Sequence, residues 1–193
     1  MINVPVRIPN TLQVTDEQFL LLVRANPDLR MERTAQGEVL AMPPTGSEGG
    51  NYNAEVTTDL GIWNRKTRLG KVFDSSTGFK LPNGATRAPD SAWVKQERWN
   101  ALSPQQRKGF APLCPDFVIE LISETDEVEI LQRKMQEYMK NGCSLGWLID
   151  PKSQKVEIYR PNHDIEVLNN PERLSGEGTL PGFILELKNI FES

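Results

Sequence analysis

The chain has 193 residues, of which 38% are hydrophobic and 25% charged, as expected for a globular domain large enough to bury a core. No stretch approaches the roughly 20 apolar residues of a membrane span, and the opening MINVPVRIPN lacks the basic start and apolar run of a signal peptide. A net charge of −4 argues against a uniformly basic nucleic-acid binder, but it permits a local basic patch or a cluster of acids that binds a metal ion.

The first third of the chain reads as two helices separated by a hairpin. Thr15 is the predicted N-cap of a helix over 16–26. Two short extended runs around Gly37 follow, within 30–42, and predict the hairpin. A second helix is expected over about 51–68, because its apolar residues share one face. These residues are Tyr52, Val56, Leu60 and Trp63.

The rest of the chain alternates strands and helices. We expect strands at 71–84, 87–94 and 115–122, the first closed by a turn at 82–84, with a polar connection over 97–114. A helix at 126–141 ends at Gly142, and a hairpin at 144–161 and a last segment at 178–191 complete the order. The sequence therefore predicts an α/β fold with a mixed central sheet flanked by helices.

The predicted domain organisation is a single domain over 1–193. It consists of a helix and hairpin at 15–43, a core over about 48–160 and a C-terminal segment at 161–193. The sequence contains no internal repeat, low-complexity tract or dividing linker.

Cysteine and histidine are scarce, which excludes several mechanisms. Cys114 and Cys143 follow no metal-ligand spacing and are too few for a disulfide scaffold, so a reduced, cytoplasmic setting is expected. His163, the single histidine, lies in the polar run RPNHD, where we expect an exposed loop. A Ser-His-Asp hydrolase and a histidine-rich zinc site are both disfavoured.

An acid stands inside the most apolar predicted strand, PDFVIELI. Residues alternate between the faces of a strand, so Glu120 shares its face with Val118 and Ile122. Both faces are apolar, which indicates a strand covered on both sides. An unpaired carboxylate there would cost several kcal/mol, so Glu120 needs a cation or several hydrogen-bond donors.

Asp90 is the predicted partner of Glu120. It lies between Ala88 and Ala92 on its own face, and these small neighbours leave room for a hydrated ion or a phosphate. If the two strands are adjacent, the carboxylates converge and need a proton or a cation, for which Mg²⁺ or Mn²⁺ is suited. The alternative, that both acids face solvent or pair with arginine, stays open. Asp116 is roughly 13 Å away along the strand and is assigned to strand entry.

Lys134 borders the apolar stripe of the helix that follows Glu120. Its long stem can cross apolar surface and bring the ammonium to the sheet edge, where it would orient water or stabilise charge on a phosphoryl oxygen. A solvated helix lysine is the other interpretation.

Three motifs resemble the PD-(D/E)XK nuclease superfamily, and more closely its Uma-type, restriction-endonuclease-like branch. They are APDSAWV, PDFVIEL and KMQEYMKNGCSLGWLIDP. The resemblance extends upstream through 32–56 and 70–84 and downstream to LPGFILEL, nearly the whole chain. It implies a restriction-endonuclease-like core with a divalent-metal site at one sheet edge, where Asp90 matches the first motif acid and Glu120 the second.

The resemblance also implies further site residues. The superfamily lysine would stand at Ile122, and Lys134 matches members in which the lysine has moved to the next helix. The carbonyl of Leu121 would be a further metal ligand. Glu55 matches an acid of the first core helix, with Glu48 as its competitor.

Relatives carry an acid one turn before the helix lysine, and here this position is Ile130. The change either refills the core or marks a weakened site.

The leading functional prediction is a Mg²⁺-dependent endonuclease, with Mn²⁺ as a substitute ion, that hydrolyses phosphodiester bonds in DNA. The alternatives are a catalytically weakened or inactive module for nucleic-acid or protein interaction, and a structural homodimer. Double-strand cutting would suggest a two-fold dimer. No membrane partner is expected. Basic residues are available for phosphate contact, but none is assigned. They are Arg65, Lys66, Arg68, Lys71, Arg87, Arg98, Arg107 and Lys108.

Overall fold

A computed structural model describes residues 12–42 and 44–191, so the opening decapeptide MINVPVRIPN lies outside the described range. Within this range the largest sheet has six strands in the order β10-β9-β8-β7-β6-β3. Its strands are β3 (Gly70–Asp74), β6 (Ser91–Lys95), β7 (Phe117–Leu121), β8 (Leu145–Asp150), β9 (Lys155–Tyr159) and β10 (Glu166–Asn169). The central pair, β7 and β8, is parallel and the other pairs are antiparallel, so the sheet is mixed as predicted.

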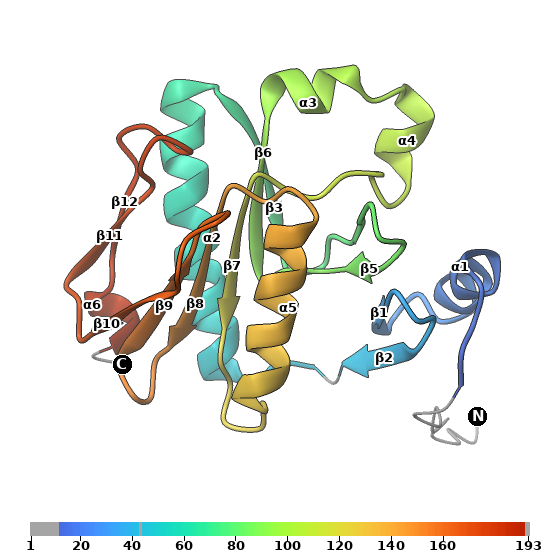
Figure 1. Ribbon diagram of the computed structural model, residues 1–193, viewed down its shortest axis with the longest axis horizontal. Coiled ribbons are helices and arrows are strands. Elements are labelled where there is room, and N and C mark those ends of the chain that lie inside the picture. Colours follow the sequence, from blue (N-terminus) through green and yellow to red (C-terminus); the bar gives the residue numbers. More distant parts are fainter. Residues whose placement is uncertain (1–11, 43, 192–193) are drawn as a thin grey trace.

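A smaller sheet lies beside the large one, in the order β2-β1-β5-β4. Its strands are β1 (Arg30–Arg33), β2 (Val39–Met42), β4 (Phe79–Lys80) and β5 (Thr86–Arg87). Helix α1 (Asp16–Ala25) packs on it through Phe19, which clusters with Met31 and Val39. Figure 1 shows these N-terminal elements on the opposite side of the molecule from β10 and the C-terminal elements β11 (Arg173–Ser175), β12 (Ile184–Glu186) and α6 (Lys188–Phe191).

Helices cover both faces of the large sheet, as the apolar character of both faces of β7 predicts. On one face, Phe117 and Ile119 pack in one cluster with Leu60 of α2 (Ser47–Thr67). On the other face, Val118 packs with Met135 of α5 (Val128–Lys140). In Figure 1 helix α5 lies in front of the sheet and α2 behind it. The side chain of Glu120 therefore projects toward α5.

Several predicted elements are confirmed together with their local causes. Thr15 caps α1 in a capping box with Gln18, and the hairpin turns at Gly37, whose φ is +94°. Helix α5 ends at Lys140 with Asn141 as its C-cap, before Gly142 with φ +98°. The left-handed φ of both glycines is a conformation that other residues rarely adopt.

Three segments differ from the prediction. The segment 71–84 forms β3 and β4, which belong to different sheets, rather than one strand. The segment 87–94 is likewise divided between β5 and β6, because Pro89 offers no N–H for a ladder. The polar connection contains two short helices, α3 (Gln96–Ala101) and α4 (Pro104–Lys108), the latter started by a capping box at Ser103.

No helix in residues 12–42 and 44–191 has both the length and the apolar character needed to cross a membrane.

Candidate active site

Asp90 and Glu120 lie together where β6 begins and β7 ends. The two strands are antiparallel with Ser91 opposite Ile119, so continuing this register places Asp90 opposite Glu120. Pro89 interrupts the ladder here, and the Asp90 carboxylate takes over as acceptor: its Oδ2 receives the Leu121 N–H at 2.9 Å. The N–H and C=O of one strand residue point the same way, so the Leu121 carbonyl faces this spot as well.

Helix α5 brings two donors to Glu120. The Lys134 ammonium lies 2.8 Å from Glu120 Oε1, and the Tyr138 hydroxyl donates to the same oxygen at 3.0 Å. Glu120 is 2% exposed and Lys134 8%, so this is a buried ion pair and not a surface contact. Lys134 therefore reaches the sheet edge, as predicted, and is not a solvated helix lysine.

A third acid, Glu32 of β1, completes the cluster and was missed by the sequence analysis. Its Oε1 lies 2.8 Å from Lys134 Nζ, and its Oε2 lies 3.0 Å from Arg87 Nη1. Arg87 in turn contacts Glu137 of α5 at 2.6 Å through Nε. Strand alternation did not single out Glu32, because Met31 beside it is buried too.

Arg30 lies at the margin of the cluster. Its Nη2 donates to the Ala88 carbonyl at 2.8 Å and lies 3.4 Å from Asp90 Oδ1. The side chain of Arg30 is 24% exposed and that of Asp90 14%, so solvent reaches the cluster at this margin.

The electrostatics of the cluster follow from burial and from the close spacing of like charges. Burial raises the pKa of Glu120 to about 7, and the charges of Asp90 and Glu32 add to the effect against the opposing charge of Lys134. Burial acts in the same direction on Glu32, but Lys134 and Arg87 outweigh it and lower the pKa of Glu32.

Burial lowers the pKa of Lys134, but the surrounding carboxylates outweigh it, so the pKa lies above its ordinary value. Lys134 is therefore an ammonium at neutral pH.

The donor set fits a hard divalent cation. Mg²⁺ takes oxygen ligands, often from one or two carboxylates, and keeps several waters. Over the described part of the chain, no group of three or more His, Cys, Asp or Glu side chains is arranged to hold a metal ion. An ion here would thus rest on Asp90, Glu120 and the Leu121 carbonyl, and its charge would relieve the repulsion that raises the pKa of Glu120.

The structure does not bring Glu55 into this cluster. Its Oε2 lies 3.4 Å from Asn189 Nδ2 of α6, and its charge contributes to raising the pKa of Asp59 after burial. The competitor Glu48 is exposed and accepts the Tyr52 hydroxyl at 3.1 Å. Neither placement supports the expectation that the second helix supplies a metal ligand.

Two isoleucines stand where the resemblance leads us to expect a lysine and an acid, and their surroundings differ. Ile122 packs against the cluster of buried residues under α5. Ile130 is 46% exposed, so it does not refill the core.

Two of the basic residues near the motif strands belong to internal ion pairs. Arg87 pairs with Glu32 and Glu137, and Arg98 lies 3.0 Å from Asp116 Oδ1. Asp116 also accepts the Lys95 N–H at 2.9 Å, which confirms its role at the entry of β7.

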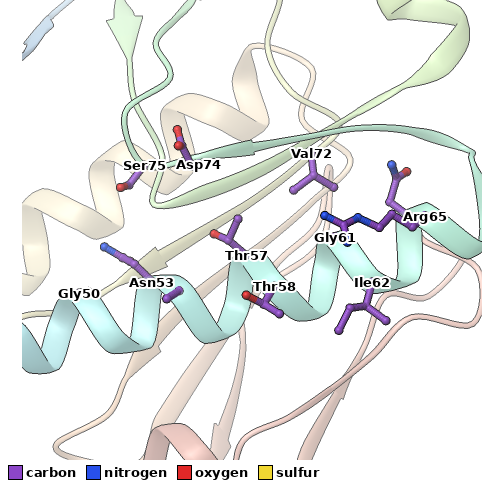
Figure 2. Close-up of a pocket in the computed structure, with 12 residues that line it drawn as sticks. Gly50, Asn53, Thr57, Thr58, Gly61, Ile62, Arg65, Val72, Asp74 and Ser75 are labelled. Carbon is purple, nitrogen blue, oxygen red and sulfur yellow. The ribbon is translucent and has the colours of Figure 1, made fainter.

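A groove of about 640 Å³, lined by both polar and apolar side chains, runs between α2 and β3. Figure 2 shows Asn53 and Thr57 pointing from the helix toward the strand that carries Asp74, with Arg65 at the far end. Asp74 pairs in register with Ser91, the residue after Asp90, so this end of the groove lies at the same end of the sheet as the acid cluster, although on the α2 face.

Comparisons with known proteins identify a family and a fold. The model of the Uma2 family, described as "Putative restriction endonuclease", matches residues 16–188. The crystal structure of a "putative nuclease belonging to DUF820" from Anabaena variabilis ATCC 29413 superposes with a TM-score of 0.77 at 21% identity, over 93% of this chain and 98% of that chain. At this identity the likeness shows the fold alone. No curated protein matches the chain.

Proposed function

Because the chain belongs to the Uma2 family, we propose that it is a metal-dependent nuclease that hydrolyses phosphodiester bonds in DNA. The observation that carries the proposal is the convergence of two carboxylates and a buried ammonium: Asp90, Glu120 and Lys134. Carboxylates that repel each other favour a bound cation, and a fixed ammonium beside them favours an anionic substrate.

Each residue of the cluster has a distinct role in this proposal. Asp90, Glu120 and the Leu121 carbonyl would hold Mg²⁺ or Mn²⁺. Such an ion polarises the scissile phosphate and lowers the pKa of a bound water. Lys134 stabilises the negative charge that develops on the phosphoryl oxygens, and as an ammonium it is not the proton acceptor. Tyr138 orients the Glu120 carboxylate through its hydroxyl.

The groove between α2 and β3 supplies a path for nucleic acid. Its lining includes the polar side chains of Asn53, Thr57 and Ser75, and its Asp74 end lies at the same end of the sheet as Asp90. Arg65 borders it and is exposed, as a phosphate-binding arginine must be. We assign phosphate contact to Arg65 on this basis. Cutting of both strands would suggest a two-fold dimer, which brings two such centres together.

A second candidate is a non-catalytic module that binds nucleic acid without cutting it. The observation in its favour is that the polar atoms of the centre are already paired: both oxygens of Asp90 have protein partners, and Lys134 has three acceptors. Salt-dependent DNA binding without cleavage would select this function.

The test is cleavage of supercoiled plasmid in Mg²⁺ and in Mn²⁺. The wild type should cut, and Asp90→Asn, Glu120→Gln and Lys134→Met should each slow cutting by about 10²-fold or more. Asp116→Asn is the matched control, because Asp116 is a buried acid like Glu120 but lies at the start of β7, outside the cluster. Equal cutting by wild type and Asp90→Asn would indicate a contaminant, and no cutting with either ion would contradict the proposal.

A further inference from the structure

Glu32 is a buried carboxylate that none of the roles above requires. It is 2% exposed, and an acid in such a place is strongly destabilising unless paired. Its Oε1 accepts from Lys134 at 2.8 Å and from the Ala88 N–H at 2.9 Å, and its Oε2 accepts from Arg87 at 3.0 Å. Two cations and one amide thus fix this carboxylate in a single orientation.

The fixation of Glu32 does not depend on Glu120. Arg87 joins Glu32 on β1 to Glu137 on α5, so the small sheet and the helix that carries Lys134 are tied together by a chain of ion pairs. Glu137 has a further partner, since it accepts from the Asn83 side chain at 2.8 Å. The position of Glu32 would therefore persist if Glu120 changed its partners.

The Lys134 ammonium can donate three hydrogen bonds, and three acceptor oxygens surround it. Glu120 Oε1 and Glu32 Oε1 both lie 2.8 Å from Nζ, and the Ala88 carbonyl lies at 3.3 Å. A cation bound by Glu120 would draw charge away from one of the two carboxylates that hold Lys134. Glu32 would then be the one full negative charge in contact with the ammonium.

We propose that Glu32 is a positioning residue, which keeps Lys134 in the active centre when Glu120 binds a cation. The proposal rests on the proposed function for its meaning in catalysis. The anchoring itself can be measured without cleavage. Glu32 acts through Lys134 and is given no contact with the substrate.

The kinetic test compares Glu32→Gln with Asp116→Asn, a control of equal burial that is paired with Arg98. Glu32→Gln should lower kcat about 10–100-fold and leave KM and the Mn²⁺ affinity within about twofold, as expected for a partner that orients a functional group. In a Lys134→Met background the same substitution should change kcat no further. The proposal would be overturned if Glu32→Gln lowered kcat equally in the wild-type and Lys134→Met backgrounds. It would also be overturned if Glu32→Gln alone kept the kcat of the wild type.

The second test measures the Lys134 ammonium directly by ¹⁵N NMR, with the signal assigned by its loss in Lys134→Met. Glu120→Gln removes the Glu120 charge without any metal, and the protected signal should persist there. It should disappear in Glu32→Gln/Glu120→Gln but remain in Asp116→Asn/Glu120→Gln, because Glu32 alone then shields the ammonium from exchange. Loss in Glu120→Gln alone, or persistence in the Glu32 double variant, would overturn the anchoring.

The two tests separate the failure of anchoring from the failure of the proposed function. If the wild type cuts no DNA, the nuclease proposal is wrong. The NMR measurement would still show whether Glu32 holds the Lys134 ammonium in place. If Glu32→Gln does not fold, Glu32→Gln/Arg87→Gln replaces it, since a neutral pair of similar shape leaves neither charge buried alone. That variant should give the same loss of the ammonium signal in the Glu120→Gln background, and persistence would contradict the proposal.

Discussion

Glu120 is the residue whose charge state decides whether the cluster can bind a cation. In the folded protein its pKa is raised from 4.5 to about 7 by burial and by Asp90 and Glu32. The folded state therefore binds more protons than the unfolded state between about pH 4.5 and pH 7. The contribution of Glu120 to the free energy of unfolding is therefore largest below pH 4.5 and is lost as the pH rises to about 7.

We predict that Glu120→Gln removes this pH dependence. From the bottom to the top of the window, the free energy of unfolding of the wild type should fall by about 3 kcal/mol relative to the variant. The pKa of Glu32 is lowered in the folded protein, so Glu32 is ionised throughout this window and adds little to the difference. Urea unfolding at several pH values measures the difference, and Glu124→Gln, an exposed acid, should follow the wild type. A difference independent of pH would show that the pKa of Glu120 is not raised.

At the scale of elements, two glycines test how tightly β3 packs on β6 and how much room surrounds α2. A Cβ on Gly70 would lie 2.2 Å from the Val94 carbonyl oxygen and 2.5 Å from the Trp93 ring. Gly70→Ala should therefore destabilise the protein by roughly 1–3 kcal/mol. A Cβ on Gly61 meets nothing within 4 Å, so Gly61→Ala should stabilise α2 by about 0.5–1 kcal/mol. Urea unfolding of both variants should give opposite signs, and equal signs would contradict this packing.

The groove along α2 leads to a prediction about DNA binding. If Arg65 contacts a phosphate, Arg65→Ala should reduce the slope of log affinity against log salt concentration by about 1. Lys66→Ala is the matched control, because Lys66 is the next residue of the same helix but does not line the groove. Fluorescence anisotropy in the Asp90→Asn background, where cutting should be slowed by about 10²-fold or more, measures both slopes. An equal change in the two variants would remove the groove from the proposed path.

At the scale of the whole molecule, the N-terminal and C-terminal segments are built into the core. Lys134 contacts Glu32 of the small sheet at 2.8 Å, and Phe183 of the C-terminal segment stacks on Trp147 with ring centroids 6.0 Å apart. We propose that the chain unfolds as a single domain. Tryptophan fluorescence and far-UV circular dichroism should then report one coincident urea transition. Two separated transitions would show that the segments form independent units.

The layers of the fold and the meeting of Asp90, Glu120 and Lys134 could be predicted from the sequence. Periodicity identified α2 and α5, and a lone acid in an apolar strand identified Glu120, because both signals are local. The contacts of Glu32 and Arg87 with α5 are long-range, and no periodicity reports them. The division of 87–94 at Pro89 was missed for another reason: the segment was read as one strand, although proline interrupts a ladder. The proposed role of Glu55 came from resemblance, and tertiary packing placed that residue beside α6.

The claim on which the account depends is that Asp90 and Glu120 share one divalent cation. The most direct measurement is anomalous diffraction from crystals soaked in Mn²⁺, for the wild type and Asp90→Ala. We predict one peak at roughly 2.0–2.3 Å from carboxylate oxygens of both residues in the wild type, and none there in the variant. No peak at this position in the wild type, or an unchanged peak in Asp90→Ala, would contradict it.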